Sequence, residues 1–274
     1  MGRYRDALPA LDEAERRFEG VPSCTHELGR AWFRRGAILF KMNGLDEALR
    51  YVRLSVNIFA ALDDHRRIAQ AQLVEGNVLF EKGQFDEART LWLAIAPVFE
   101  AGRDRHSLAS LWLNLGWCDL ERGDTDSARA WFVRALDRFA HIHSSIDVAR
   151  SSWALALTEA RYGNRSSGLR ALRRERDELV RLGVATEAGM VALDIAEILL
   201  LDPANASDAA AVCRDLVQLF ERAGASKEVL KALAYLWEAA NARAANAELV
   251  QKIRDGVRRA ERDTAWVFDE RALR

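Results

Sequence analysis

Three short stretches of this chain are similar and lie 40 residues apart. They read GAILFKMN from Gly36, GNVLFEKG from Gly76 and GWCDLERG from Gly116. A second landmark recurs in phase with them, as Asp46-Glu47-Ala48, Asp86-Glu87-Ala88 and Asp126-Ser127-Ala128. A fixed period of this length is typical of a stack of identical supersecondary units, each of which covers its neighbour. We therefore expect a repeat array.

Each period reads as two antiparallel helices. The small residues Gly36 and Ala48, and their equivalents in later periods, allow two helices to approach closely. Larger apolar residues such as Trp112 and Phe132 lie one or two helical turns away from the small ones, a helical stripe and not the alternation of a strand. Turn signals such as Asn43-Gly44 stand where a helix pair must end. The pattern predicts an all-α protein.

Several local signals predict where these helices start and stop. We expect the repeats to begin near residues 26, 65, 105, 145, 185 and 226. The candidate N-caps before the first helices are Thr25, Asp63, Asp104, Ser144 and Ser226. Pro97 is predicted to end or kink its helix, because it removes an amide bond to Leu93.

The third repeat carries the strongest family signature. Its small, aromatic and leucine positions are Ala109, Trp112, Asn114, Leu115, Gly116, Gly123, Asp124, Ala128, Phe132, Ala135 and Leu136. In these residues the chain resembles the tetratricopeptide repeat family, over roughly residues 2 to 245. It departs from the family in its period of 40 residues, where the family has about 34, and in lacking the usual proline at the end of the second helix. The resemblance implies a right-handed α-solenoid of about 13 antiparallel helices.

The predicted organisation is a single solenoid over residues 1–274. Residues 1–20 form an unpaired leading helix, residues 26–245 hold six repeats of about 40 residues, and residues 246–274 form a capping helix and tail that completes the last repeat. On the leading helix, Leu8, Leu11 and Phe18 make a face that a partner helix would normally cover. We expect a preceding segment, or another chain, to cover that face.

The C-terminal helix is expected to close the array. Leu249, Val250, Ile253 and Val257 make one apolar stripe, and the remaining positions, Arg254 among them, are polar as in a capping helix. Trp266 and Phe268 are expected to fold back on this helix.

Composition narrows the possible partners. The net charge of −1 implies no general affinity for nucleic acid or anionic membrane. Arg170, Arg173, Arg174 and Arg176 form the densest basic run, interleaved with acids, which indicates a solvated helix with internal ion pairs or, alternatively, an anion- or RNA-facing patch. Only five of the 40 basic residues are Lys, a skew typical of high-GC bacterial genomes.

The expected setting is the bacterial cytoplasm. The first residues are charged throughout and no apolar run reaches the roughly 18 residues that span a bilayer, so neither a secretion signal nor a membrane segment is predicted. Cys118 and Cys213 fall on apolar helix faces and Cys24 lies in a loop, so no disulfide framework is indicated.

The sequence carries no catalytic motif that we recognise. It has no P-loop, no GxGxxG after a strand, no HExxH and no GxSxG. His141 and His143 lack a third ligand nearby in sequence, so two solvated histidines at a helix end are preferred to a metal site. We predict no enzyme activity, no cofactor and no metal.

Binding must then use the surface. In tetratricopeptide arrays the first helices of successive repeats line a concave groove, and the resemblance places the aromatic residues Phe33, Phe40, Phe80, Trp117, Trp153 and Trp237 there. Exposed rings would form an apolar trough suited to a protein or peptide. The alternative is that the long helices overlap and bury these rings within the stack.

One polar constellation points to a peptide ligand. In chaperone-binding members of the family, basic and Asn residues of three successive first helices hold a peptide's terminal carboxylate. Asn77, Asn114 and Arg150 stand at matching positions, whereas Leu73 and Ala154 replace two further basic residues. Asn can bond a peptide backbone and Arg can fork onto a carboxylate. Ordinary polarity of the helix surface is the alternative.

These observations rank the possible functions. The first is a noncatalytic scaffold that binds a protein or peptide in the groove, as part of a larger regulatory protein or complex. The second is the signal-sensing module of a bacterial transcription regulator or effector system, because long-helix arrays of this type are familiar beside DNA-binding or effector domains. In that case the output domain lies outside this chain.

Overall fold

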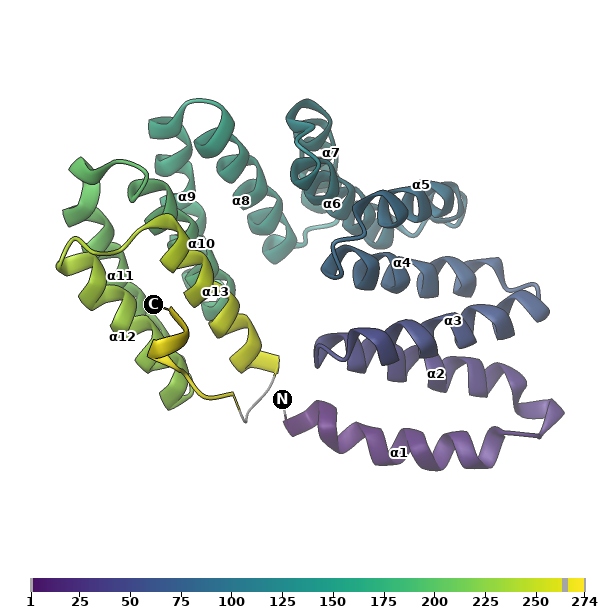
Figure 1. Ribbon diagram of the computed structural model, residues 1–274. Helices are drawn as coiled ribbons and strands as arrows, with labels where there is room; N and C mark the ends of the chain where they lie inside the picture. Colours follow the sequence, from purple (N-terminus) through teal and green to yellow (C-terminus); the bar gives the residue numbers. More distant parts are fainter. Residues whose placement is uncertain (1, 263–265, 274) are drawn as a thin grey trace. The chain divides into compact units, whose positions relative to one another are not determined.

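The computed structural model describes residues 2–262 and 266–273, with side chains for residues 7–260 and 266–271. The described part forms 13 α-helices and no strand (Figure 1). They are α1 (Gly2–Phe18), α2 (Thr25–Lys41), α3 (Leu45–Ala61), α4 (His65–Glu81), α5 (Phe85–Ala101), α6 (Arg105–Glu121), α7 (Thr125–His141), α8 (Ser145–Tyr162), α9 (Arg165–Arg181), α10 (Ala185–Leu199), α11 (Ala206–Arg222), α12 (Lys227–Asn241) and α13 (Ala247–Arg262). Three short 3-10 helices accompany them, η1 (Pro22–Cys24), η2 (Pro203–Asn205) and η3 (Glu270–Leu273). The predicted all-α solenoid is confirmed.

The helices pair into repeats as expected. The first helices, α2, α4, α6, α8, α10 and α12, each begin within one residue of a predicted start. The second helices, α3, α5, α7, α9, α11 and α13, follow them in turn. The chain divides into two compact units, Met1–Arg138 and Phe139–Arg274, with the division inside α7. Whether residues 1–274 form a single domain stays a prediction.

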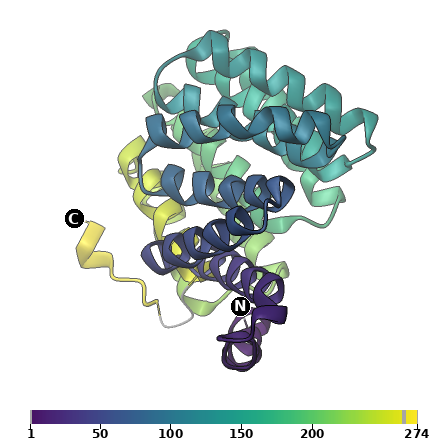
Figure 2. The same ribbon diagram turned by 90° about the vertical axis from the view of Figure 1, so that its right-hand side faces the viewer.

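Within the first compact unit, consecutive helices pack against each other in chain order (Figures 1 and 2). The first helices also contact one another, α2 with α4 and α4 with α6. In the second compact unit α8 to α12 repeat this order, and α8 contacts α10. The first helices α2, α4 and α6 therefore form a continuous inner layer in the first unit, and α8 and α10 form one in the second.

A recurring turn explains the 40-residue period. Helices α2 to α7 each have 17 residues and are separated by three-residue turns, so a new helix begins every 20 residues. The middle turn residue has a positive φ, as at Asn43, Asp63 and Gly83. The next amide then bonds back to the helix, for example Asp64 N to Phe59 O at 2.9 Å. This bond satisfies a carbonyl that the helix end would otherwise leave unpaired.

The glycine landmark marks where the paired helices approach most closely. A Cβ atom at Gly36 would overlap Val52, one at Gly76 would overlap Trp92, and one at Gly116 would overlap Phe132. Each pair joins the first and second helices of one repeat at a separation of 16 residues. The second landmark supplies the fully buried Ala48, Ala88 and Ala128.

The acidic part of that landmark ties one repeat to the next. Lys82 at the end of α4 pairs with Asp46 at the start of α3. One repeat later, Arg122 Nε lies 2.8 Å from Asp86 Oδ1 in the equivalent arrangement. The recurring Asp residues thus serve the junction between repeats, a role that spacing alone did not indicate.

Two N-cap predictions need correction. Asp64, and not Asp63, caps α4 by accepting a bond from Arg67 N at 3.1 Å, because Asp63 occupies the positive-φ turn position. Thr25 is the first residue of α2 and not its cap. Pro97 does not end α5, which continues to Ala101, so a kink at Pro97 is the part of that prediction that stands.

Both ends of the array pack against their neighbours. On α1, Leu8, Leu11 and Phe18 are half-buried, and Glu15 Oε1 accepts a bond from Trp32 Nε1 of α2 at 2.8 Å. The C-terminal tail folds back as predicted. The Phe268 ring lies 5.8 Å from that of Tyr235 in α12, and Trp266 lies against Gly256 of α13. Residues 263–265 and 274 of the predicted cap lie outside the described part.

Candidate binding faces on the first helices

The predicted amide pair is joined directly. Asn77 of α4 and Asn114 of α6 are half-buried, and Asn114 Nδ2 donates to Asn77 Oδ1 over 2.8 Å. This bond uses one of the two amide hydrogens of Asn114 and one lone pair of Asn77. The pair links consecutive first helices at a junction between repeats.

The aromatic positions of the first compact unit are half-buried rather than exposed, namely Phe33, Phe40, Phe80 and Trp117. The ring of Phe80 lies 5.2 Å from that of Phe85, and the ring of Trp117 meets that of Phe132 edge-on at 5.3 Å. Phe132 is fully buried. The rings of Phe80 and Trp117 therefore pack in part within their repeats, and neither an open trough nor complete burial describes the four residues.

Arg150 and Trp153 of α8 already have partners in the second compact unit. Arg150 Nη1 lies 3.0 Å from Asp147 Oδ1, and Arg150 Nη2 pairs with Glu187 of α10. Trp153 Nε1 donates to Asp194 Oδ2 over 2.7 Å. A carboxylate ligand would have to compete with Glu187 for Arg150.

Trp237 is the most exposed of the predicted rings. Its exposed fraction is 36%, and it lines a pocket of about 340 Å³ at α11 and α12 with Arg214, Asn241 and Arg243. The residues predicted as one site thus divide between the two compact units. Asn77, Asn114 and Trp117 belong to the first, while Arg150, Trp153 and Trp237 belong to the second.

Sequence reasoning missed a buried ionic cluster in the second compact unit, which we call the α10 acid cluster. It consists of Asp194 and Glu197 of α10 with Arg161 of α8 and Gln251 and Arg254 of α13. Asp194 and Glu197 are only 4% and 8% exposed, and burial raises the pKa of Asp194. The available signal was two acids inside the apolar run from Met190 to Leu200, where a charge needs a partner.

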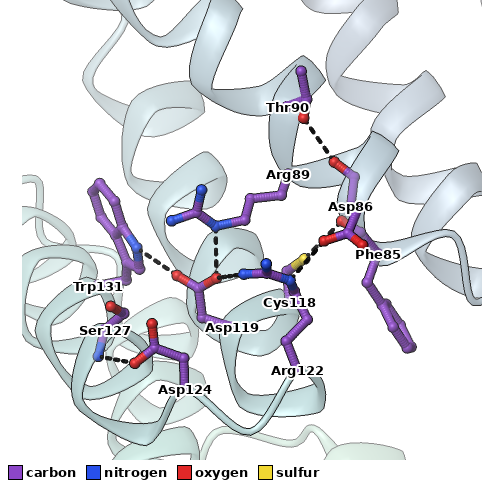
Figure 3. A network of polar contacts seen from close by, with 10 residues as sticks. All are labelled: Phe85, Asp86, Arg89, Thr90, Cys118, Asp119, Arg122, Asp124, Ser127 and Trp131. Atoms are coloured by element: carbon purple, nitrogen blue, oxygen red, sulfur yellow. Dashed lines mark hydrogen bonds and ion pairs between the residues drawn. The ribbon is translucent and has the colours of Figure 1, made fainter.

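A second buried acid holds three helices of the first compact unit together (Figure 3). Asp119 of α6 is fully buried and accepts bonds from Arg89 Nε of α5 at 2.7 Å and Trp131 Nε1 of α7 at 3.1 Å. Arg122 bridges Asp119 to Asp86. Beside them the Cys118 thiol donates to Phe85 O over 3.1 Å, and burial raises its pKa to about 11. Acids and arginines balance here, which fits a structural clasp better than a ligand site.

Three further predictions concern a metal site, a membrane segment and the basic run of arginines. Among the described residues, no three His, Cys, Asp or Glu side chains group closely enough to hold a metal ion. Likewise, none of the described helices combines the length and apolarity that a membrane crossing requires. Within the basic run, Arg176 Nη2 lies 2.7 Å from Asp177 Oδ1.

Comparison with known proteins identifies the type of repeat. A family model described as tetratricopeptide repeat matches residues 67–141. No curated protein sequence matches the chain.

Several solved structures resemble most of this chain at low sequence identity. A Rap protein complexed with competence and sporulation factor is 15% identical, with a TM-score of 0.64 over 96% of this chain and 72% of that one. The Rap conjugation gene regulator of plasmid pLS20, in complex with a Phr peptide, is 13% identical, with a TM-score of 0.62 over 98% and 73%. A signal transduction ATPase with a tetratricopeptide repeat sensor from Pyrococcus horikoshii is 13% identical, with a TM-score of 0.66 over 91% and 38%. At these identities the likeness establishes the fold.

Proposed function

We propose that this chain, a solenoid of tetratricopeptide-type repeats, is a noncatalytic scaffold that binds a protein or peptide segment along its first helices. The observation that carries the proposal is the bonded pair Asn77–Asn114, which joins consecutive first helices beside the half-buried ring of Trp117. Amide groups and an adjacent aromatic ring are what an extended peptide needs for its backbone and side chains.

Two fold relatives support this choice. One relative is complexed with competence and sporulation factor and another with a Phr peptide. A regulatory role in a larger complex, in a bacterial cytoplasm, belongs to the same proposal. No cofactor or nucleic acid takes part in it.

The proposed ligand lies along the first helices of the first compact unit. Asn77 and Asn114 bond its backbone and Trp117 packs its apolar side chains, with Phe33, Phe40 and Phe80 as further aromatic contacts. In the second compact unit, Arg150, Trp153 and Trp237 are proposed as contacts of their own for a ligand, where Arg150 meets a carboxylate. Because Arg150 must leave Glu187 to make its contact, most of the affinity comes from the aromatic residues.

The test starts from peptides selected on the full chain from a displayed library of random peptides. Binding of a labelled selected peptide is then measured by fluorescence anisotropy against single variants. Trp117→Ala should weaken binding by about 2 kcal/mol or more, as expected for a central aromatic anchor. Arg150→Ala should cost less, and its effect should shrink at high salt because ions screen an exposed charge.

A control separates binding from folding. Val133→Ala removes an exposed apolar side chain from the second helix α7 and should leave the affinity unchanged. Circular dichroism gives the folded fraction of each variant, which matters because Trp117 contacts Phe132. If Trp117→Ala unfolds the array while its folded fraction binds normally, the ring belongs to the core and the site is wrong.

A second candidate is the sensor module of a regulator whose output domain lies outside this chain. It is favoured by the similarity to the signal transduction ATPase with a tetratricopeptide repeat sensor, of which this chain covers 38%. The test is to find a DNA-binding or ATPase segment encoded with this chain and measure its activity with and without the selected peptide. A peptide that binds without changing that activity would favour the scaffold.

A further inference from the structure

Helix α13 does not take the position of the other second helices in its compact unit. Both α9 and α11 pack between their own first helix and the first helix of the following repeat. In contrast, α13 packs on its own first helix, α12, and on α10, the first helix of the preceding repeat (Figure 1). It therefore packs on two first helices of its compact unit, α10 and α12.

The contact face of α13 combines an apolar stripe with one cation. Val250, Ile253 and Val257 are at most 1% exposed. Between them, Arg254 extends one Nη2 atom to 2.8 Å from Asp194 Oδ1 and 2.8 Å from Glu197 Oε2. Gln251 Nε2 adds a bond of 3.2 Å to Glu197 Oε1. The Arg254 side chain keeps only 11% of its exposure.

The receiving face on α8 and α10 selects for such a cation. Trp153 Nε1 holds Asp194, and Arg161 Nη2 lies 3.3 Å from both oxygens of Glu197. Two carboxylates and one arginine leave a net negative charge on this face when α13 is absent. A helix that covers it must supply a positive group, since an unpaired buried charge is strongly destabilising.

We propose that the face formed by Trp153, Arg161, Asp194 and Glu197 is a docking site for an arginine-bearing amphipathic helix of a partner protein, with α13 as its intramolecular occupant. The partner helix matches the α13 pattern, with apolar residues at positions i, i+3 and i+7 and Arg at i+4. A partner helix of this pattern can replace α13 because its own Arg restores the ion pairs to Asp194 and Glu197 that Arg254 leaves. This site is independent of the peptide proposed for Asn77 and Asn114.

The test uses a labelled synthetic peptide with the sequence of residues 247–262, titrated into the full chain and two of its variants. Ile253→Asp places a charge in the apolar stripe of α13 and releases this helix from the receiving face. The residues of the receiving face itself are unchanged. Both Ile253→Asp and Arg254→Ala chains should bind the peptide at least about tenfold more tightly than the natural chain, because the tethered competitor is weakened. If the Ile253→Asp chain fails to fold, the Arg254→Ala chain, which keeps the apolar stripe, serves for the same titration.

Matched peptides test the chemistry of the site. A peptide with Arg254→Ala should bind the Ile253→Asp chain at least about tenfold more weakly than the parent peptide, whereas Arg258→Ala, which changes an exposed arginine of the same helix, should bind within about twofold. Equal binding of the Arg254→Ala and parent peptides would overturn the proposal. So would folded chain variants that bind no peptide. A natural chain that forms dimers by exchanging α13 would make the occupant a second copy and would also overturn it.

Discussion

The three cysteine thiols differ in burial, and therefore in pKa and reactivity, because of their positions in the fold. Cys118 and Cys213 are buried in α6 and α11, whereas Cys24 is half-buried in η1. Burial raises the pKa of Cys118 to about 11 and that of Cys213 to about 12, from an ordinary 9.0. Both buried thiols are therefore neutral and shielded at neutral pH, which makes them poor nucleophiles.

We predict that a thiol reagent at pH 8 modifies Cys24 alone in the folded chain and all three cysteines after unfolding. The raised pKa of Cys213 also makes the free energy of unfolding depend on pH. Below pH 9 the Cys213 thiol is neutral in both states, but at higher pH it ionises in the unfolded chain first. The free energy of unfolding should thus fall by up to about 1.4 kcal/mol per pH unit between pH 9 and 12 from this group.

Chemical denaturation at several pH values measures that fall. Cys213→Ala should show a smaller decrease than the natural chain, and Cys24→Ala should show the same decrease. Native-state modification of Cys213 at pH 8 would contradict the burial of its thiol.

One arginine that pairs with the buried acids shows the limit of prediction from sequence. Arg254 occupies the polar side of an amphipathic pattern, so the sequence predicts that it faces solvent. The structure instead places it on Asp194 and Glu197, because α13 packs against α10. A residue pattern tells which face of a helix is apolar, but not which distant helix receives it.

At the scale of the elements, the helices and turns could be predicted best from the sequence, because each turn needs a specific backbone conformation. Asn43, Gly83 and Gly123 are typical of the positive φ that they adopt, so their turns could be located. Arg103 and His143 adopt the same conformation without any such signal, and only the 20-residue spacing identifies them. The repeat period therefore predicted the positions of the turns better than the local residue preferences did.

The turn at Arg103 makes this point testable. Its φ of 52° is unfavourable for a residue with a Cβ atom. Arg103→Gly should therefore raise the free energy of unfolding by about 0.5–1 kcal/mol. The matched change Gly123→Ala, at φ 81° with nothing within 4 Å of an added Cβ, should lower it by about 1 kcal/mol.

Urea denaturation of both variants checks the sign. The two changes act in equivalent turns at the ends of α5 and α6, so their effects should be opposite. A loss of stability in Arg103→Gly would show that the arginine side chain contributes more than its backbone costs.

At the scale of the molecule, each helix pair contacts mainly its sequence neighbours. The stability of such an array approximates a sum of local terms, and openings remain local. Leu115→Ala, at a fully buried position of α6, should lower local stability by about 2–5 kcal/mol. Amide hydrogen exchange should then accelerate in α5 to α7 and stay unchanged in α10 and α11.

Leu193→Ala in α10, also fully buried, is the matched control and should produce the reverse pattern. Hydrogen exchange followed by mass spectrometry measures the amide exchange rates of both variants. Uniform acceleration along the chain in either variant would mean that the array unfolds as one cooperative body.

The equal spacing of the turns has a consequence for how such a chain can change its length. Duplication or loss of 40 residues keeps every later helix in its inner or outer layer, since the turn conformation recurs in register. Loss of 20 residues would exchange the two layers for the whole remainder of the array and bring apolar faces to solvent. Rearrangements of the gene should therefore be tolerated only in whole periods of 40 residues, and the similarity of the first three landmarks fits growth by such steps.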